Sequence, residues 1–109
     1  MGEALIVRRG GGGGGLDGLS VAEKDRGLDI ANGTYALLYR CWDVNEDEPY
    51  VGAGFAVVHK GDVLIHWIEP SANIGPDDIR IEVSTSSIWA ESKYGNYETE
   101  DIAIFEFSL

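Results

Sequence analysis

Two histidines, His59 and His66, are the residues of this chain whose spacing most invites a metal site. If Lys60-Gly61 forms a two-residue turn, His59 pairs with Asp62, and His66 follows four residues later on the same face. The two rings would then lie about 13 Å apart, at about 3.3 Å per strand residue. Two ligands of one zinc ion lie much closer together than this. We therefore expect two partly buried sheet histidines, no metal site and no cofactor.

The single cysteine, Cys41, is the other residue that could do chemistry. One cysteine forms no disulfide within the chain, and the apolar segment around it, 37–42, predicts a buried thiol. The serine-rich stretch 84–87 contains no G-x-S-x-G nucleophile elbow. The glycine run at 10–15 lacks the Lys-Ser/Thr pair of a phosphate-binding loop. The sequence therefore predicts a protein that is not an enzyme.

The acidic segment 43–47 places oxygen ligands at alternate positions, as a calcium loop begins. An EF-hand loop would continue with glycine at its sixth position and glutamate at its twelfth. Glu48 and Gly54 occupy those positions here. A solvated acidic loop fits this pattern better, with calcium binding as the alternative.

Aromatic residues offer a further candidate site, a platform on which a sugar ring could stack. The residues concerned are Trp42, Trp67, Trp89, Tyr94 and Tyr97. Trp67 shares a face with two aliphatic residues of its predicted strand, which favours core packing. Trp89, Tyr94 and Tyr97 lie in or beside a predicted loop and are the better candidates for a ligand platform. The alternative is that they close the core at strand ends.

The elements that must position these residues are short strands separated by turn signals. Asn32-Gly33, between two apolar runs, predicts a tight hairpin. The pattern predicts an all-β fold, a small antiparallel β-sandwich or barrel of six to seven strands. The main predicted strands are 34–42, buried on both faces, 50–59, 62–69, 79–89, with clean alternation, and 102–109. Residues 16–109 would form this β-sandwich domain.

The first 15 residues form a predicted N-terminal arm. Its contact residues are Leu5, Ile6, Val7, Arg8 and Arg9, and its flexible tether is the run Gly10, Gly11, Gly12, Gly13, Gly14 and Gly15. Glycine has little conformational preference, and six extended residues reach about 20 Å. The arm either folds back in cis as the first strand of its own sheet or docks onto a neighbouring subunit. The long linker slightly favours exchange between subunits.

The charge of the chain is uneven. Its net charge is −11, and residues 1–9 hold two arginines and one glutamate, leaving six basic and eighteen acidic residues in the rest. An acidic body argues against nucleic-acid binding, and no segment is apolar enough to cross a membrane. Repulsion between like charges would keep the chain soluble. Alternatively, the arm seeks an acidic surface, such as that of an identical neighbour.

The opening segment 4–11, Ala-Leu-Ile-Val-Arg-Arg-Gly-Gly, resembles the N-termini of small tail-associated and tail-fibre-like proteins of bacteriophages and prophages. The resemblance implies a non-catalytic virion structural protein, made in the host cytoplasm and assembled as repeated copies in a tail, fibre or capsid decoration. Its partners would be identical subunits or other virion proteins. The alternative function is a β-module that binds carbohydrate or a host surface through Trp89, Tyr94 and Tyr97.

Overall fold

The protein has an all-β fold, as the sequence predicts. The computed structural model describes residues 5–7, 19–21, 28–45, 51–70 and 73–107. Six described strands have five or more residues, within the predicted number, and two further strands have three residues each. The strands are β1 (Leu5–Val7), β2 (Leu19–Val21), β3 (Thr34–Asp43), β4 (Val51–His59), β5 (Asp62–Ile68), β6 (Ile79–Val83), β7 (Ile88–Ser92) and β8 (Tyr97–Phe107), with a short 3-10 helix, η2 (Pro76–Asp78), before β6.

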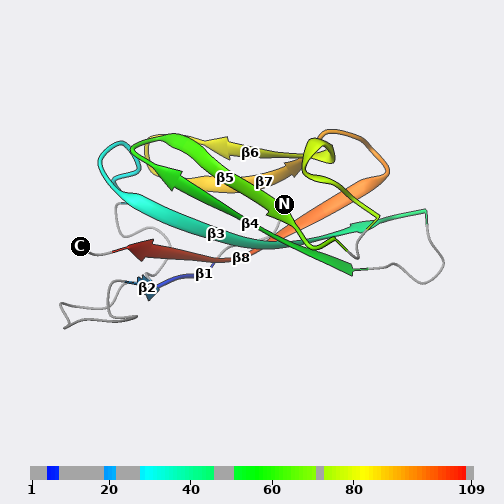
Figure 1. Cartoon of the computed structure of the whole chain (residues 1–109), viewed down its shortest axis with the longest axis horizontal. Coiled ribbons are helices and arrows are strands. Elements are labelled where there is room, and N and C mark those ends of the chain that lie inside the picture. Colours follow the sequence, from blue (N-terminus) through cyan, green and yellow to red (C-terminus); the bar gives the residue numbers. More distant parts are fainter. Residues whose placement is uncertain (1–4, 8–18, 22–27, 46–50, 71–72, 108–109) are drawn as a thin grey trace.

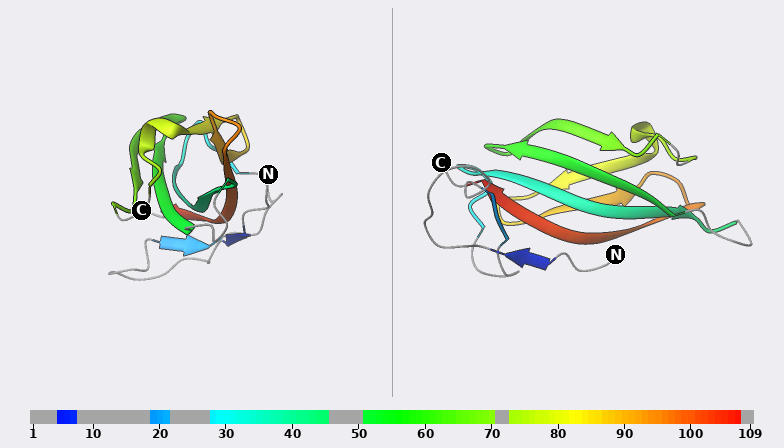
Figure 2. Two further views of the ribbon diagram at one scale, coloured as in Figure 1. Left: turned by 90° about the vertical axis from the view of Figure 1, so that its right-hand side faces the viewer. Right: turned by 60° about the horizontal axis from the view of Figure 1, so that its bottom comes forward.

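The strands form two sheets (Figure 1). The main sheet has the order β1-β8-β3-β4-β5, with β2 also paired to β8, and the second sheet is the β6–β7 hairpin. Among the described strands, β1 against β8 is the one parallel pairing, and the others are antiparallel. β1 and β2 lie outside the curled body, along β8 (Figure 2).

The core lies between the inner face of the main sheet and the β6–β7 hairpin. Alternate residues of β3 face it, because successive side chains of a strand point to opposite faces. The pattern therefore buries Tyr35, Leu37, Tyr39 and Cys41 and leaves the other face of β3 more exposed. The sequence prediction that this strand is buried on both faces is wrong. The remaining core side chains include Leu28, Ile30, Val58, Ile68, Ile74, Ile79, Ile88, Ala90 and Ile104.

Side chains, rather than a backbone ladder, fasten the second sheet to β8. The Ala90 N–H donates to the buried Asp101 carboxylate at 2.9 Å, and the Thr99 hydroxyl donates to the Ala90 carbonyl at 3.0 Å. A buried carboxylate is costly unless it accepts such bonds. The two bonds satisfy both backbone groups of Ala90, so β7 lies beside β8 without pairing to it.

The tight hairpin forms at a different place from the one that Asn32-Gly33 predicts. Asn32 and Gly33 both donate their N–H groups to the Asp29 carbonyl, so the chain makes a turn that leads into β3, and the described residues 28–33 contain no strand. The positive φ angles of a tight hairpin turn occur instead at Lys60 (49°) and Gly61 (85°), between β4 and β5. His59 pairs with Asp62 across this turn, as expected.

The predicted strand 79–89 is in fact a hairpin. Its first part is β6, its last residues open β7, and the serine-rich stretch between them forms the turn. The Ser84 N–H donates to the Ser87 carbonyl at 2.9 Å and closes this turn. Serine hydroxyls bond locally to turn backbone, and the Ser86 N–H donates to the Ser84 hydroxyl here. This interrupts the alternation that the sequence pattern extends through Trp89.

A β-bulge in β5 reverses the faces predicted for its residues. Val57 pairs with Ile65 and Val58 with Val63, so Leu64 is the extra residue. After a bulge of one residue, every following side chain of the strand points to the opposite face of the sheet from the one expected without the bulge. The part of β5 that follows the bulge therefore presents the face opposite to the one expected from the turn.

Candidate functional site

The bulge places the two histidines on opposite faces of the sheet. His66 pairs with the inward-facing Ala56 and is half-buried, whereas His59 is exposed and bonds to the Thr34 hydroxyl at 2.7 Å. The prediction that both lie on one face is wrong for this reason. Within the described residues, no group of three or more His, Cys, Asp or Glu side chains could hold a metal ion.

His66 takes part in an internal polar contact. Its Nε2 lies 2.6 Å from the Tyr39 hydroxyl, and the two rings are tilted, with centroids 5.9 Å apart. Burial, and then the positive charge of Lys93, lower the pKa of His66, while Asp77 opposes this shift. Burial also raises the pKa of Tyr39. A neutral imidazole bonded to a protonated phenol is therefore the stable state near neutral pH.

Cys41 is a free, buried thiol, as its apolar neighbours predict. Burial raises its pKa to about 11, and the negative charge of Asp78 adds to this rise. The thiolate is the nucleophilic form of cysteine. At neutral pH this thiol is protonated and shielded, so the geometry gives it a packing role.

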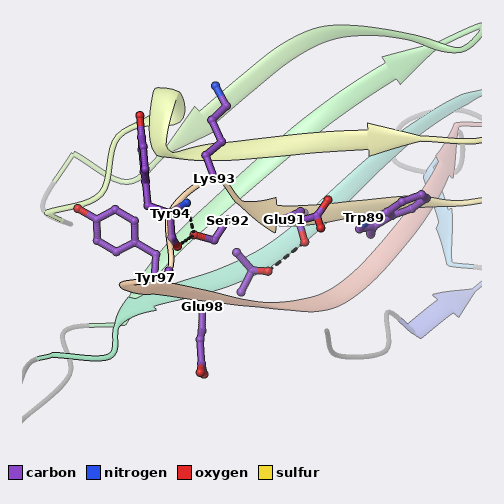
Figure 3. A pocket seen from close by; sticks show the side chains of 10 residues that line it. Trp89, Glu91, Ser92, Lys93, Tyr94, Tyr97 and Glu98 are labelled. Carbon is purple, nitrogen blue, oxygen red and sulfur yellow. Dashed lines mark hydrogen bonds between the residues drawn. The ribbon is translucent and has the colours of Figure 1, made fainter.

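The structure brings the three residues of the predicted ligand platform to one pocket. Trp89 comes from β7, Tyr94 from the loop after it, and Tyr97 from the start of β8. The pocket has a volume of about 610 Å³. Figure 3 shows Trp89 at one end and the two tyrosines together at the other. The platform is therefore two separate aromatic surfaces joined by a groove.

Local hydrogen bonds fix the tyrosine end of this pocket. The Ser92 hydroxyl donates to the Tyr94 carbonyl at 2.5 Å, and the Tyr97 N–H donates to the same carbonyl at 3.3 Å. The rings of Tyr94 and Tyr97 meet edge to face, with centroids 6.5 Å apart and planes at 75°. Tyr94 is 54% exposed, so one aromatic ring of a rigid pair is open to a ligand.

The wall of the pocket carries charged residues of both signs. Glu91, Lys93 and Glu98 are at its wall, and Glu91 is held by Arg80 at 3.3 Å. In Figure 3 the Lys93 and Glu98 side chains point to opposite sides of the groove. Aromatic surfaces with a few polar groups between them are the usual composition of a small-molecule site.

The described part of the arm, residues 5–7, pairs with its own chain in this single-chain structure. Residues Leu5–Val7 form β1 and pair in parallel with Ala103, Ile104 and Phe105 of β8. Arg8, Arg9 and the tether Gly10–Gly15 lie outside the described residues. Of the two alternatives for the arm, the structure thus shows the one in which it extends its own sheet.

Sequence reasoning missed an exposed apolar surface on the outer face of the main sheet. Trp67 follows the bulge, faces outward and is 43% exposed, so its assignment to the core is wrong. Its ring packs against Phe55 of β4, with centroids 5.5 Å apart. The signal that could have revealed this surface is the apolar content of both faces of the 34–42 segment, of which only one face enters the core.

No family model, no curated protein and no solved structure matches this chain. Among the described residues there is no helix long and apolar enough to span a membrane.

Proposed function

We propose that this chain is a non-catalytic structural subunit of a multi-copy assembly, in which its N-terminal arm docks onto a neighbouring subunit. The observation that carries the proposal is β1, a three-residue strand added in parallel to the outer edge of β8. An edge strand pairs through backbone groups, which are the same whether the arm comes from its own chain or from another copy. A parallel pairing of three residues is weak. Replacing the pairing of β1 within its own chain by the same pairing with another copy therefore costs little free energy.

The linker and the charge distribution support exchange. The arm ends in a run of six glycines, a composition that lets a linker reach beyond its own domain at little conformational cost. The arm carries two arginines, whereas the rest of the chain is strongly acidic. Attraction between a basic arm and an acidic body favours docking on an identical neighbour, and the acidic bodies repel one another elsewhere.

We place this assembly in a phage virion, as a tail, fibre or capsid-decoration protein. The support for this setting is the resemblance of residues 4–11 to the openings of small phage tail-associated proteins. Multi-copy particles use the same contact repeatedly, which suits a small domain with an exchangeable strand.

The test is light scattering after size-exclusion chromatography of the full chain and of the chain without residues 1–9, over a series of concentrations. The full chain should associate, and the shortened chain should be a monomer with an unchanged far-ultraviolet circular dichroism spectrum. Association that persists in the shortened chain would refute docking through the arm.

The pocket that contains Trp89, Tyr94 and Tyr97 supports a second candidate function, binding of a carbohydrate or host-surface glycan. Stacking on an exposed aromatic ring is worth about 1 kcal/mol, or roughly a fivefold to tenfold change in affinity. Trp89→Ala and Tyr94→Ala should each weaken binding to a panel of neutral oligosaccharides by about this factor. Trp67→Ala is the matched control, since Trp67 is exposed but lies outside the pocket. Equal affinity in all three variants, or no binding by the unmodified chain, would exclude this candidate.

A further inference from the structure

The outer face of the main sheet carries two adjacent apolar rows that run across three strands. The strand register aligns Leu38, Phe55 and Trp67 in one row, and Ala36, Val57 and Ile65 in the next. Facing residues of neighbouring strands lie about 5 Å apart, so the six side chains form one patch without a charged residue inside it. This apolar outer face is not part of the core, which lies on the opposite side of the sheet.

The apolar outer face is open and ordered. Leu38, Ile65 and Trp67 are 37%, 49% and 43% exposed, whereas the inner-face residues Tyr39 and Val58 are fully buried. Contact between the Phe55 and Trp67 rings holds both side chains in place. Side chains that are already ordered lose little entropy when a partner covers them.

The exposed apolar area approaches the apolar part of a standard protein interface. Leu64, the extra residue of the bulge at the β5 edge of the sheet, adds a side chain that is 62% exposed. Taking roughly 200 Å² for a large apolar side chain, we estimate that Leu64 and the three exposed residues of the rows present about 380 Å². A standard interface buries about 800 Å² on each partner, a little over half of it apolar. The largest apolar patch on a typical soluble monomer has about this size, roughly 300–600 Å², and is often functional.

The rim of the apolar outer face carries charges of both signs. At one end, the Nη2 of Arg40 donates to both carboxylate oxygens of Glu100 at 2.8 Å, and both residues are partly exposed. At the other end lie the exposed residues His59 and Asp62. Because Arg40 and Glu100 neutralise each other, this end of the apolar outer face adds no net charge to a contact between two copies.

We propose that the apolar outer face seats a second copy of this chain in a two-fold, face-to-face packing of the main sheets. This inference rests on the proposed multi-copy assembly and gives it a second contact, distinct from the arm. The net charge of −11 makes most other surfaces of two copies repel each other. The apolar rows hold no carboxylates, so this face is where two acidic bodies approach at least electrostatic cost.

Sedimentation velocity over a concentration series, with the full chain, tests this interface. Trp67→Lys should raise the dimer dissociation constant at least tenfold, because a charge would be buried between the sheets. Ile65→Lys should do the same and provides a second variant if the first does not fold, as judged by circular dichroism. Val44→Lys is the matched control: Val44 is also apolar and 43% exposed, but it lies outside the rows, and this variant should dimerise like the unmodified chain.

Ile6→Pro separates this interface from docking through the arm, because proline removes a backbone donor from β1. Association lost in Trp67→Lys but kept in Ile6→Pro supports the face and refutes the arm. The reverse result refutes the face and supports the arm, and loss in both variants supports both contacts. A Trp67→Lys chain that dimerises as tightly as Val44→Lys overturns the inference, and a full chain that stays monomeric overturns both proposals.

Discussion

The two faces of the main sheet are both apolar, yet only one belongs to the core. On the inner face, the β6–β7 hairpin covers the sheet and leaves Tyr39 and Val58 without exposed surface. On the outer face, Leu38 and Trp67 stay about two-fifths exposed. The difference is in what covers each face and not in residue type. Apolar composition therefore shows that a face needs a partner, and the fold decides whether that partner is in the same chain.

A pair of matched substitutions gives the most direct test of this comparison. Ile104 is on the inner face and 1% exposed, and Ile65 is on the outer face and 49% exposed. Ile104→Ala should lower the free energy of unfolding by about 3 kcal/mol, since it opens a cavity in the core. Ile65→Ala should cost less than about 1 kcal/mol in dilute protein, because water already reaches the site. Urea denaturation measures both, and equal losses would contradict the assignment of the two faces.

Gly54 extends the comparison of the two sheet faces, because it tests how tightly the inner face is packed. The Tyr39 ring lies directly over Gly54, and a Cβ atom there would overlap the ring. Gly54→Ala should therefore lower the free energy of unfolding by about 2 kcal/mol, since a buried ring has little space to move.

Gly95→Ala is the control for this substitution. A Cβ at Gly95 meets no atom within 4 Å, so its stability should change by less than about 0.5 kcal/mol. Thermal unfolding followed by circular dichroism compares the two variants. A Gly54→Ala protein as stable as Gly95→Ala would show that the Tyr39 ring moves freely.

The smallest expected effect is a pH dependence that comes from His66, on the inner face. Its pKa is lowered in the folded protein, so the unfolded chain binds a proton more readily. The contribution of neutral His66 to stability is thus complete above its unfolded pKa of about 6.5, and it is lost as pH falls through the lower folded value. Denaturation at about pH 7.5 and about pH 5.5 should show a larger loss in the unmodified protein than in His66→Gln. Identical losses would exclude this linkage.

The composition of the strands was enough to predict the all-β fold class. Which side of the sheet each side chain faces, and where the candidate site residues lie, depended on single residues. Alternation and turn signals correctly indicate β strands around the 59–62 turn and a buried Cys41. No feature of the sequence pattern predicts the bulge at Leu64, because the bulge depends on how β5 pairs with β4. It reversed the expected positions of His66 and Trp67. Trp89, Tyr94 and Tyr97 are close to one loop in the sequence, and this was enough to predict that they share a pocket. It did not show that the tryptophan and the tyrosines lie at opposite ends of that pocket.

The reactivity of the buried Cys41 thiol can be used to measure how often the sheet around it opens. With a pKa of about 11 and no exposed surface, the thiol reacts with an alkylating reagent only when the sheet around it separates. The rate of labelling then equals the intrinsic thiol reactivity multiplied by the fraction of molecules that are open. Because the chain has one cysteine, mass spectrometry of the intact protein would follow this single event without an added probe.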